Sequence, residues 1–123
     1  MQIHFKGTNY ELTSEHTAHA QKKLEGLRKY LGKGNEYARA YVDIGKETEA
    51  HQTGRIWYVD INFDADGTRF YAKAVEETIE SAIDRAVGDL ASALHTARKR
   101  HISMVRKGGV MLKGMMRGFG TQS

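Results

Sequence analysis

Cysteine and proline are absent from this sequence of 123 residues, and no acidic residue follows Asp89. Without cysteine the chain can form neither a disulfide framework nor a thiolate metal site, which fits a reducing compartment. No apolar run approaches the roughly 20 residues that span a bilayer, so no transmembrane helix is expected. The amino terminus lacks a basic segment followed by an apolar one, so no secretory signal is expected either. The sequence therefore predicts a cytoplasmic protein with no membrane partner.

The lack of acid after Asp89 divides the chain into two regions of opposite charge. Residues 1–89 hold 12 Lys/Arg against 15 Asp/Glu, a net charge of −3, whereas residues 90–123 hold seven Lys/Arg and no acid. The formal net charge of the whole chain is +4. So uneven a distribution favours a polyanionic partner such as RNA.

Hydrophobic periodicity predicts four strands and two helices in the order β-α-β-β-β-α. Alternating apolar residues indicate strands at 2–6, 37–44, 55–63 and 68–74. The first helix is expected to be capped by Thr13 or Ser14 and to end at the glycines of 31–35. The second is expected to be capped by Thr78 and to end within 101–107. No proline interrupts any of these elements.

Each predicted helix carries one apolar stripe, and each predicted strand is apolar on one side. The two stripes are Ala20, Leu24, Leu27 and Leu31, and Ile79, Ile83, Ala86, Leu90, Leu94 and Ala97. An α+β fold with two helices packed on one face of a four-stranded sheet buries all of these residues at once. We expect one domain at 1–103, followed by a flexible, basic, Gly/Met-rich tail at 104–123.

Basic residues lie opposite both helical stripes, and the tail adds more. Such a surface suits phosphate recognition, because each Lys or Arg that neutralises a phosphate releases condensed counterions. The alternative is that they form an ordinary solvated helix face. The residues predicted to bind RNA phosphates are Lys22, Lys23, Lys29, Arg85, Arg98, Lys99, Arg100, Arg106, Lys107, Lys113 and Arg117.

Tyrosines on the opposite side of the strands suggest a second way to bind RNA. Aromatic residues on an open sheet can stack unpaired bases, and here they alternate with Arg39, Arg69 and Lys73. Tyrosine is also simply a good strand former on a half-exposed surface. The tyrosines concerned are Tyr37, Tyr41, Tyr58 and Tyr71.

Motifs for catalysis or metal binding are weak. His16 and His19 have the i, i+3 spacing of a helical chelate but lack an obvious third ligand. No nucleophile elbow, phosphate loop or catalytic carboxylate pair can be assigned, so we expect no enzyme, cofactor, metal or small-molecule substrate. A tail that acts alone on a membrane is disfavoured by its five glycines from Gly108 on.

Several stretches together resemble the ribosome hibernation-promoting factor and ribosome-associated inhibitor A family. They are the "ELTSEH…KKLEGLRKYL" run at 11–31, the "DG" turn before the fourth strand, and "SAIDRAVGDLASAL" at 81–94. The resemblance covers about residues 1–101 in the same element order. Lys22 and Lys23 match basic positions of the family's first helix, and Arg98 and Arg100 match positions near the end of the second. Gly26, Asp89 and Ser92 stand where family members often carry Lys or Arg.

This resemblance implies a non-enzymatic, cytoplasmic stress factor that inhibits translation. It would bind the decoding channel of the small ribosomal subunit and block transfer RNA and messenger RNA. Its partners would be the small subunit and its ribosomal RNA, with ribosomal proteins near the channel as further candidate contacts. The alternative is a general single-stranded RNA-binding module that uses the tyrosine-rich sheet face.

Overall fold

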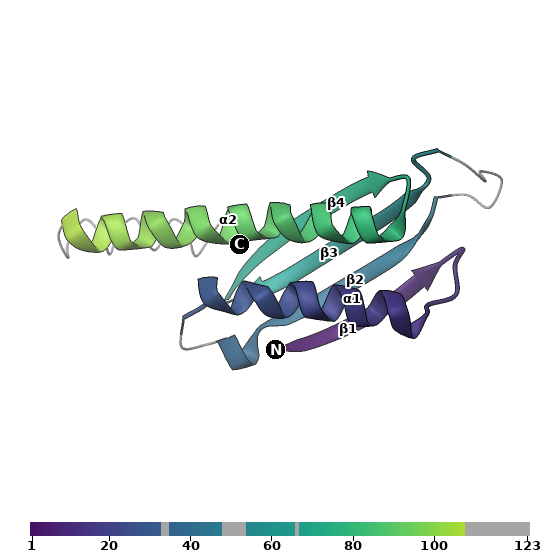
Figure 1. The fold of residues 1–123 in the computed structure, drawn as a ribbon. Helices are drawn as coiled ribbons and strands as arrows, with labels where there is room; N and C mark the ends of the chain where they lie inside the picture. The colour runs from purple at the N-terminus through teal and green to yellow at the C-terminus, as the bar shows by residue number, and fades with distance from the viewer. Residues whose placement is uncertain (33–34, 48–53, 66, 108–123) are drawn as a thin grey trace.

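The predicted β-α-β-β-β-α order is confirmed. The structure is a computed structural model that describes residues 1–32, 35–47, 54–65 and 67–107, with side chains up to Arg100. Two helices lie side by side over one face of a four-stranded sheet (Figure 1). The strands are β1 (Gln2–Thr8), β2 (Arg39–Lys46), β3 (Trp57–Ala65) and β4 (Thr68–Glu76), and the helices are α1 (Ser14–Glu25) and α2 (Ile79–Lys107).

The sheet is mixed, and its strands lie in sequence order. β1 pairs with β2 in parallel, with Ile3 opposite Ala40, whereas the β2–β3 and β3–β4 pairs are antiparallel. A parallel pair needs a crossover connection, and α1 supplies it. The observed strands match the predicted ones to within two residues at each end.

The core lies between the sheet and the two helices. Apolar side chains from α1, α2, β2, β3 and β4 are buried there, and β1 adds the half-buried Ile3 and Phe5. No buried polar or charged residue occurs in the described part of the chain.

Ala97 was predicted to lie in the core, but it is exposed. The apolar stripe of α2 is buried only as far as Leu94, which is 4% exposed. Beyond that point α2 continues past the end of the sheet (Figure 1), so Ala97 keeps its helical phase but has nothing to pack against.

None of the described helices is long and apolar enough to cross a membrane.

The first helix was predicted to continue to the glycines at 31–35, but α1 ends at Glu25. A 3₁₀-helix at Gly26–Tyr30 follows it, and Leu27 and Leu31 remain buried. The predicted caps are confirmed, because the hydroxyls of Thr13 and Thr78 accept hydrogen bonds from the backbone amides three residues later.

Gly45 permits the close approach of β1 and β2 at the end of their pairing. It lies opposite Thr8, and a Cβ atom added to Gly45 would lie 2.1 Å from the Thr8 carbonyl oxygen. Backbone atoms cannot give way as a flexible side chain can, so a larger residue must separate the two strands. Gly88 differs, because a Cβ atom there would meet nothing within 4 Å.

We expect Gly45→Ala to lower the free energy of unfolding by about 1 to 3 kcal/mol, the usual cost of overpacking. Gly88→Ala is the matched control, and we expect it to raise the free energy of unfolding by about 0.5 to 1 kcal/mol, since alanine is the better helix former. Urea unfolding of the two variants measures both changes. Equal changes in the free energy of unfolding of the two variants would contradict the close contact between Gly45 and Thr8.

Candidate nucleic-acid interface

The two helices run in the same direction and are joined by a polar seam near their amino-terminal ends. His16 Nε2 lies 2.7 Å from Glu80 Oε1, and His19 Nε2 lies 2.8 Å from Asp84 Oδ1. Lys23 Nζ lies 3.6 Å from the same Asp84 oxygen. The carboxylates of α2 therefore face the histidines and the lysine of α1.

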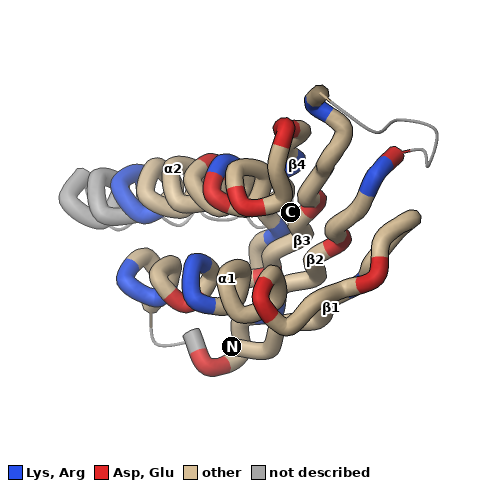
Figure 2. The backbone as a smooth tube through the Cα atoms, turned by 45° about the vertical axis from the view of Figure 1, so that its right-hand side comes forward, with Lys and Arg blue, Asp and Glu red and all other residues tan. Residues whose placement is uncertain are grey.

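Farther along the helices the seam changes from mixed charge to positive charge. Lys and Arg gather toward the carboxyl ends of α1 and α2 (Figure 2), and Asp and Glu lie toward the amino end of α2. The guanidinium Nη1 of Arg98 donates a hydrogen bond of 3.2 Å to the carbonyl oxygen of Lys29 and so links α2 to the 3₁₀-helix. Among the described residues, no carboxylate lies within 4.0 Å of the charged nitrogens of Lys29, Arg98 or Lys99.

A shallow hollow of about 410 Å³ opens at this basic end of the helix pair. Its walls are Lys29, Tyr30, His95, Arg98 and Lys99. The rings of Tyr30 and His95 meet edge to face with their centroids 5.8 Å apart, and Lys29 Nζ lies 5.3 Å from the centre of the Tyr30 ring. We call these five residues the basic hollow.

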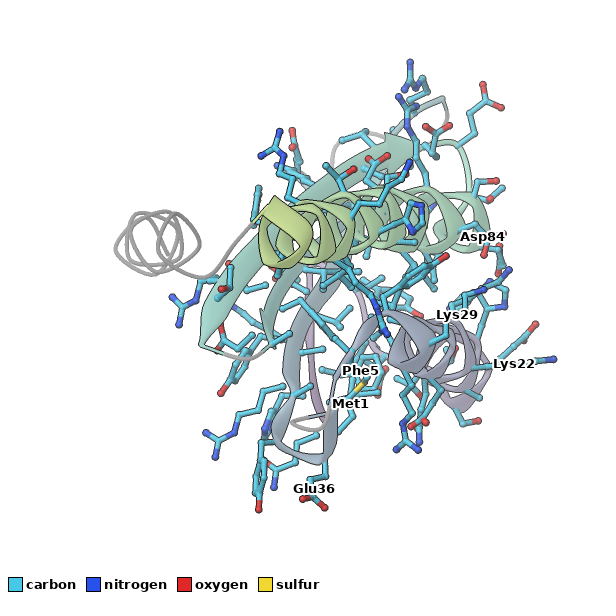
Figure 3. The ribbon with its side chains drawn as sticks, turned by 90° about the vertical axis from the view of Figure 1, so that its left-hand side faces the viewer. Met1, Phe5, Lys22, Lys29, Glu36 and Asp84 are labelled. Atoms are coloured by element: carbon cyan, nitrogen blue, oxygen red, sulfur yellow. The ribbon has the colours of Figure 1, made fainter. Side chains whose placement is uncertain are left out.

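The other predicted phosphate-binding residues are more scattered. Lys22 projects from α1 into solvent (Figure 3), whereas Lys29 lies on the side that faces α2. Arg100 is exposed. It follows Arg98 by two residues, and this separation places it about 200° around the axis of α2 from Arg98. Arg106 and Lys107 lie on α2 beyond the last described side chain, and Lys113 and Arg117 lie outside the described residues.

Arg85 lies in an ion pair and is separate from the basic hollow. Its Nη1 atom lies 2.5 Å from Glu76 Oε2, and Arg55 Nη2 lies 3.4 Å from the same oxygen. The hydrogen bond from Arg85, with the charge of Arg55, lowers the pKa of the Glu76 carboxyl and in turn raises the pKa of Arg85. Because Glu76 neutralises Arg85, the guanidinium of Arg85 has less positive charge to offer a phosphate than its position in the sequence suggested.

The open face of the sheet is less suited to stacking bases than the sequence suggested. His4, Tyr41, Asn62 and Tyr71 form one row across the four strands, in which His4 stacks on Tyr41 at 5.0 Å. Tyr58, however, is only 7% exposed. Its burial raises its pKa, and its hydroxyl donates to Asp43 at 3.0 Å.

Carboxylates are interspersed among the remaining aromatic and basic groups of that face. Asp60 lies opposite Asp43 in the sheet and accepts a hydrogen bond from the Tyr71 hydroxyl at 2.9 Å, which raises the pKa of Tyr71. Asp64 Oδ1 lies 2.9 Å from Arg69 Nε. Three aspartates therefore oppose a phosphate backbone on this face, whereas none lines the basic hollow.

His16 and His19 are used in the seam and not in a chelate. Their Nε2 atoms face two different carboxylates, and Nδ1 of His16 lies 2.5 Å from the Tyr10 hydroxyl. Within the described residues, no three His, Asp or Glu side chains are arranged to hold a metal ion. What the helix surface offers chemically is binding of anions and aromatic groups.

Tyr30 is the functional candidate that sequence reasoning did not identify. It lies within the run predicted as the first helix, and no periodicity distinguishes it from a peripheral core residue. Helical phase places His95 with Lys99 on the side of α2 opposite the apolar stripe, so the sequence predicts a surface or phosphate-contacting residue there. The signal that unites them is spatial, because the parallel helices bring residue 30 beside residue 95.

Comparisons with known proteins agree with this fold. The model of the family described as "Sigma 54 modulation protein / S30EA ribosomal protein" matches residues 3–102. The amino-terminal domain of Thermus thermophilus Protein Y is similar in structure, with a TM-score of 0.62, 23% sequence identity, and coverage of 77% of this chain and 93% of that one. A ribosomal subunit interface protein from Coxiella burnetii gives a TM-score of 0.64 at 15% identity, covering 80% and 99%. No curated protein matches the chain.

The Glu80 carboxylate of the seam has a pH dependence that can be measured. A hydrogen bond from its own backbone amide, followed by one from His16, lowers the pKa of Glu80 below its ordinary value of 4.5. A carboxyl whose pKa is lower in the folded chain than in the unfolded chain stabilises the fold at pH values above its unfolded pKa. That stabilisation is lost as the pH falls through the folded pKa.

We expect Glu80→Gln to lower the free energy of unfolding at pH 7 by about 0.5 to 1 kcal/mol, as for other exposed ion pairs. The difference from wild type should shrink as the pH falls below 4.5, the ordinary pKa of Glu80. Urea unfolding between pH 7 and pH 3 measures this. Glu77→Gln, which removes another exposed acid at the start of α2, is the control, and the same loss there would contradict a specific role for the seam.

Proposed function

The chain belongs to the sigma-54 modulation protein / S30EA ribosomal protein family, and on that premise we propose that it binds the small ribosomal subunit and inhibits translation. In this proposal the domain lies in the decoding channel, where it occupies space that transfer RNA and messenger RNA need. No chemical step is required, since a rigid body in the channel excludes both ligands by volume.

The observation that carries this proposal is a cluster of cations with no described carboxylate partner, where the 3₁₀-helix after α1 lies beside α2. Lys29, Arg98 and Lys99 line one hollow, and no described carboxylate lies within 4.0 Å of their charged nitrogens. Ribosomal RNA offers closely spaced phosphates, and guanidinium and ammonium groups neutralise them with release of counterions. Lys22, Lys23 and Arg100 would extend the contact at its margins.

Two features make the sheet face a weaker candidate for RNA binding. Tyr58 is buried and bonded to Asp43, so its ring cannot accept a base. Tyr41 and Tyr71 are 41% and 58% exposed, but they neighbour three aspartates that repel phosphate. General single-stranded RNA binding by this face therefore serves as the alternative in the experiments below.

Sedimentation with purified ribosomal subunits tests the proposal. We expect wild type to bind the small subunit stoichiometrically, with transfer RNA displacing it. The triple variant Lys29→Gln, Arg98→Gln, Lys99→Gln should bind at least about tenfold more weakly, a loss of about 1.4 kcal/mol. Its affinity should also depend less on salt, with the slope of log K against log salt reduced by about 3.

The matched control changes three cations of the open sheet face, Arg39→Gln, Arg69→Gln and Lys73→Gln. It lowers the net charge by the same amount and should leave subunit binding nearly unchanged. Equal loss in the two triple variants would mean that net charge alone drives binding. Loss of subunit binding in the sheet-face variant only would show that the sheet face, and not the basic hollow, binds the subunit.

The residues after α2 are proposed to add phosphate contacts without determining the binding site. Deleting 108–123 removes Lys113 and Arg117 and leaves the helix intact. We expect the truncated chain to bind the same subunit with a salt slope lower by about 2. Complete loss of subunit binding, measured in the same gradients, would instead show that this segment holds the principal contacts.

A further inference from the structure

We propose that the basic hollow is a binding site for one unstacked nucleotide. Its base would lie against Tyr30 and His95, and its phosphate would be held by Lys29, Arg98 and Lys99. This inference rests on the proposed function where the nucleotide is part of ribosomal RNA. The same chemistry would also accept a free nucleoside monophosphate, and the experiments below separate the two sources.

The size and openness of the hollow fit a nucleotide. About 410 Å³ is within the range of small-ligand pockets, about 300 to 1,000 Å³. Four of the five lining residues are exposed, and only Tyr30 is half-buried. A nucleotide in the hollow can therefore remain connected to a longer chain that passes over the surface.

The two aromatic rings leave faces on which a base can stack. Tyr30 and His95 are inclined by 67°, so neither ring covers the other as in a parallel stack. The ammonium of Lys29 lies over the Tyr30 ring at 5.3 Å. An exposed cation–π contact contributes only about 0.5 to 1 kcal/mol, so a base can displace this ammonium, which then becomes free to bind the phosphate.

Arg98 is held in place, and no described carboxylate lies within 4.0 Å of the charged nitrogens of Lys29, Arg98 or Lys99. Arg98 uses Nη1 to bond the Lys29 carbonyl oxygen at 3.2 Å, which fixes the guanidinium at the rim. A guanidinium has five N–H donors, so others remain for two phosphate oxygens. Elsewhere on the helices, Arg85 and Lys23 face carboxylates at 2.5 Å and 3.6 Å. The hollow therefore brings two aromatic rings together with cations that have no carboxylate partner among the described residues.

This combination favours an unpaired nucleotide over a duplex or an acidic peptide. In a duplex the bases are stacked inside the helix, so only phosphates would reach the cations. An acidic peptide would use the cations but has no general need of the rings. Stacking on an aromatic side chain contributes about 1 to 3 kcal/mol per base, which makes the contribution of the base measurable.

Titration of the full chain with nucleoside 5′-monophosphates, followed by amide and side-chain NMR, tests the site directly. We expect shifts centred on Tyr30 and His95. Ribose 5-phosphate, which lacks the base, should bind about 5- to 150-fold more weakly, the ratio that corresponds to one stacked base. Equal affinity for ribose 5-phosphate, or shifts centred on the sheet face, would overturn the proposal.

Two variants test the stacking residues. Tyr30→Leu keeps an apolar side chain at the edge of the core and removes the stacking ring, and His95→Ala removes the second ring. Both should lose most of the preference for AMP over ribose 5-phosphate. Tyr37→Leu removes a tyrosine that is 77% exposed and does not line the hollow, and it should retain that preference. An unchanged preference in Tyr30→Leu and His95→Ala would refute the assignment.

Ribosome binding by the same variants identifies the source of the nucleotide. If Tyr30→Leu weakens both AMP binding and subunit binding, the nucleotide is part of ribosomal RNA. If it weakens only AMP binding, the ligand is a free nucleotide. A wild-type chain that binds AMP in the hollow but not ribosomes would refute the proposed function and keep the site. Subunit binding without any base preference in the hollow would support the proposed function and refute the nucleotide site.

Discussion

The parallel pairing of β1 with β2 is the constraint on which the rest of the molecule depends. It requires a crossover, so α1 must run back along the sheet against the direction of both strands. Two antiparallel pairings then turn the chain twice, and β4 finishes at the same end of the sheet as β1, although the two strands form its opposite edges. Helix α2 therefore starts where α1 starts and runs in the same direction. The relative direction of two helices far apart in sequence therefore follows from the three strand pairings.

The two parallel helices lie with their amino ends together, and charge separates along the surface that they share. Acids are favoured near helix amino ends and bases near carboxyl ends, because each end carries a partial charge of opposite sign. At the amino ends, Glu80 and Asp84 bind the two histidines of α1 and join the helices. Beyond the end of α1, Lys29 of the 3₁₀-helix meets Arg98 of α2, and no described carboxylate lies within 4.0 Å of either charged nitrogen. The same helix alignment thus provides both cohesion and a charged surface.

Periodicity and capping residues were sufficient to predict the element order, the fold class and most of the core. Each strand and cap is a local signal, and the residue types alone carry it. The end of α1 was missed because a 3₁₀ turn at Gly26 keeps Leu27 and Leu31 in contact with the core, so the apolar spacing hardly changes. Ala97 was misplaced because periodicity does not indicate where the sheet ends beneath a helix.

The basic residues show the same limit of sequence reasoning for function. Arg85 and Arg98 both belong to α2 and look alike in sequence, yet one is bound by Glu76 while the other bonds only a carbonyl oxygen. Whether a cation can hold a phosphate depends on the acids within a few ångströms, and these come from other elements. The same argument disfavours the sheet face, where the strand register places Asp43, Asp60 and Asp64 among the tyrosines and arginines. Neighbouring acids, more than the number of basic residues, decide which surface of this domain can face RNA.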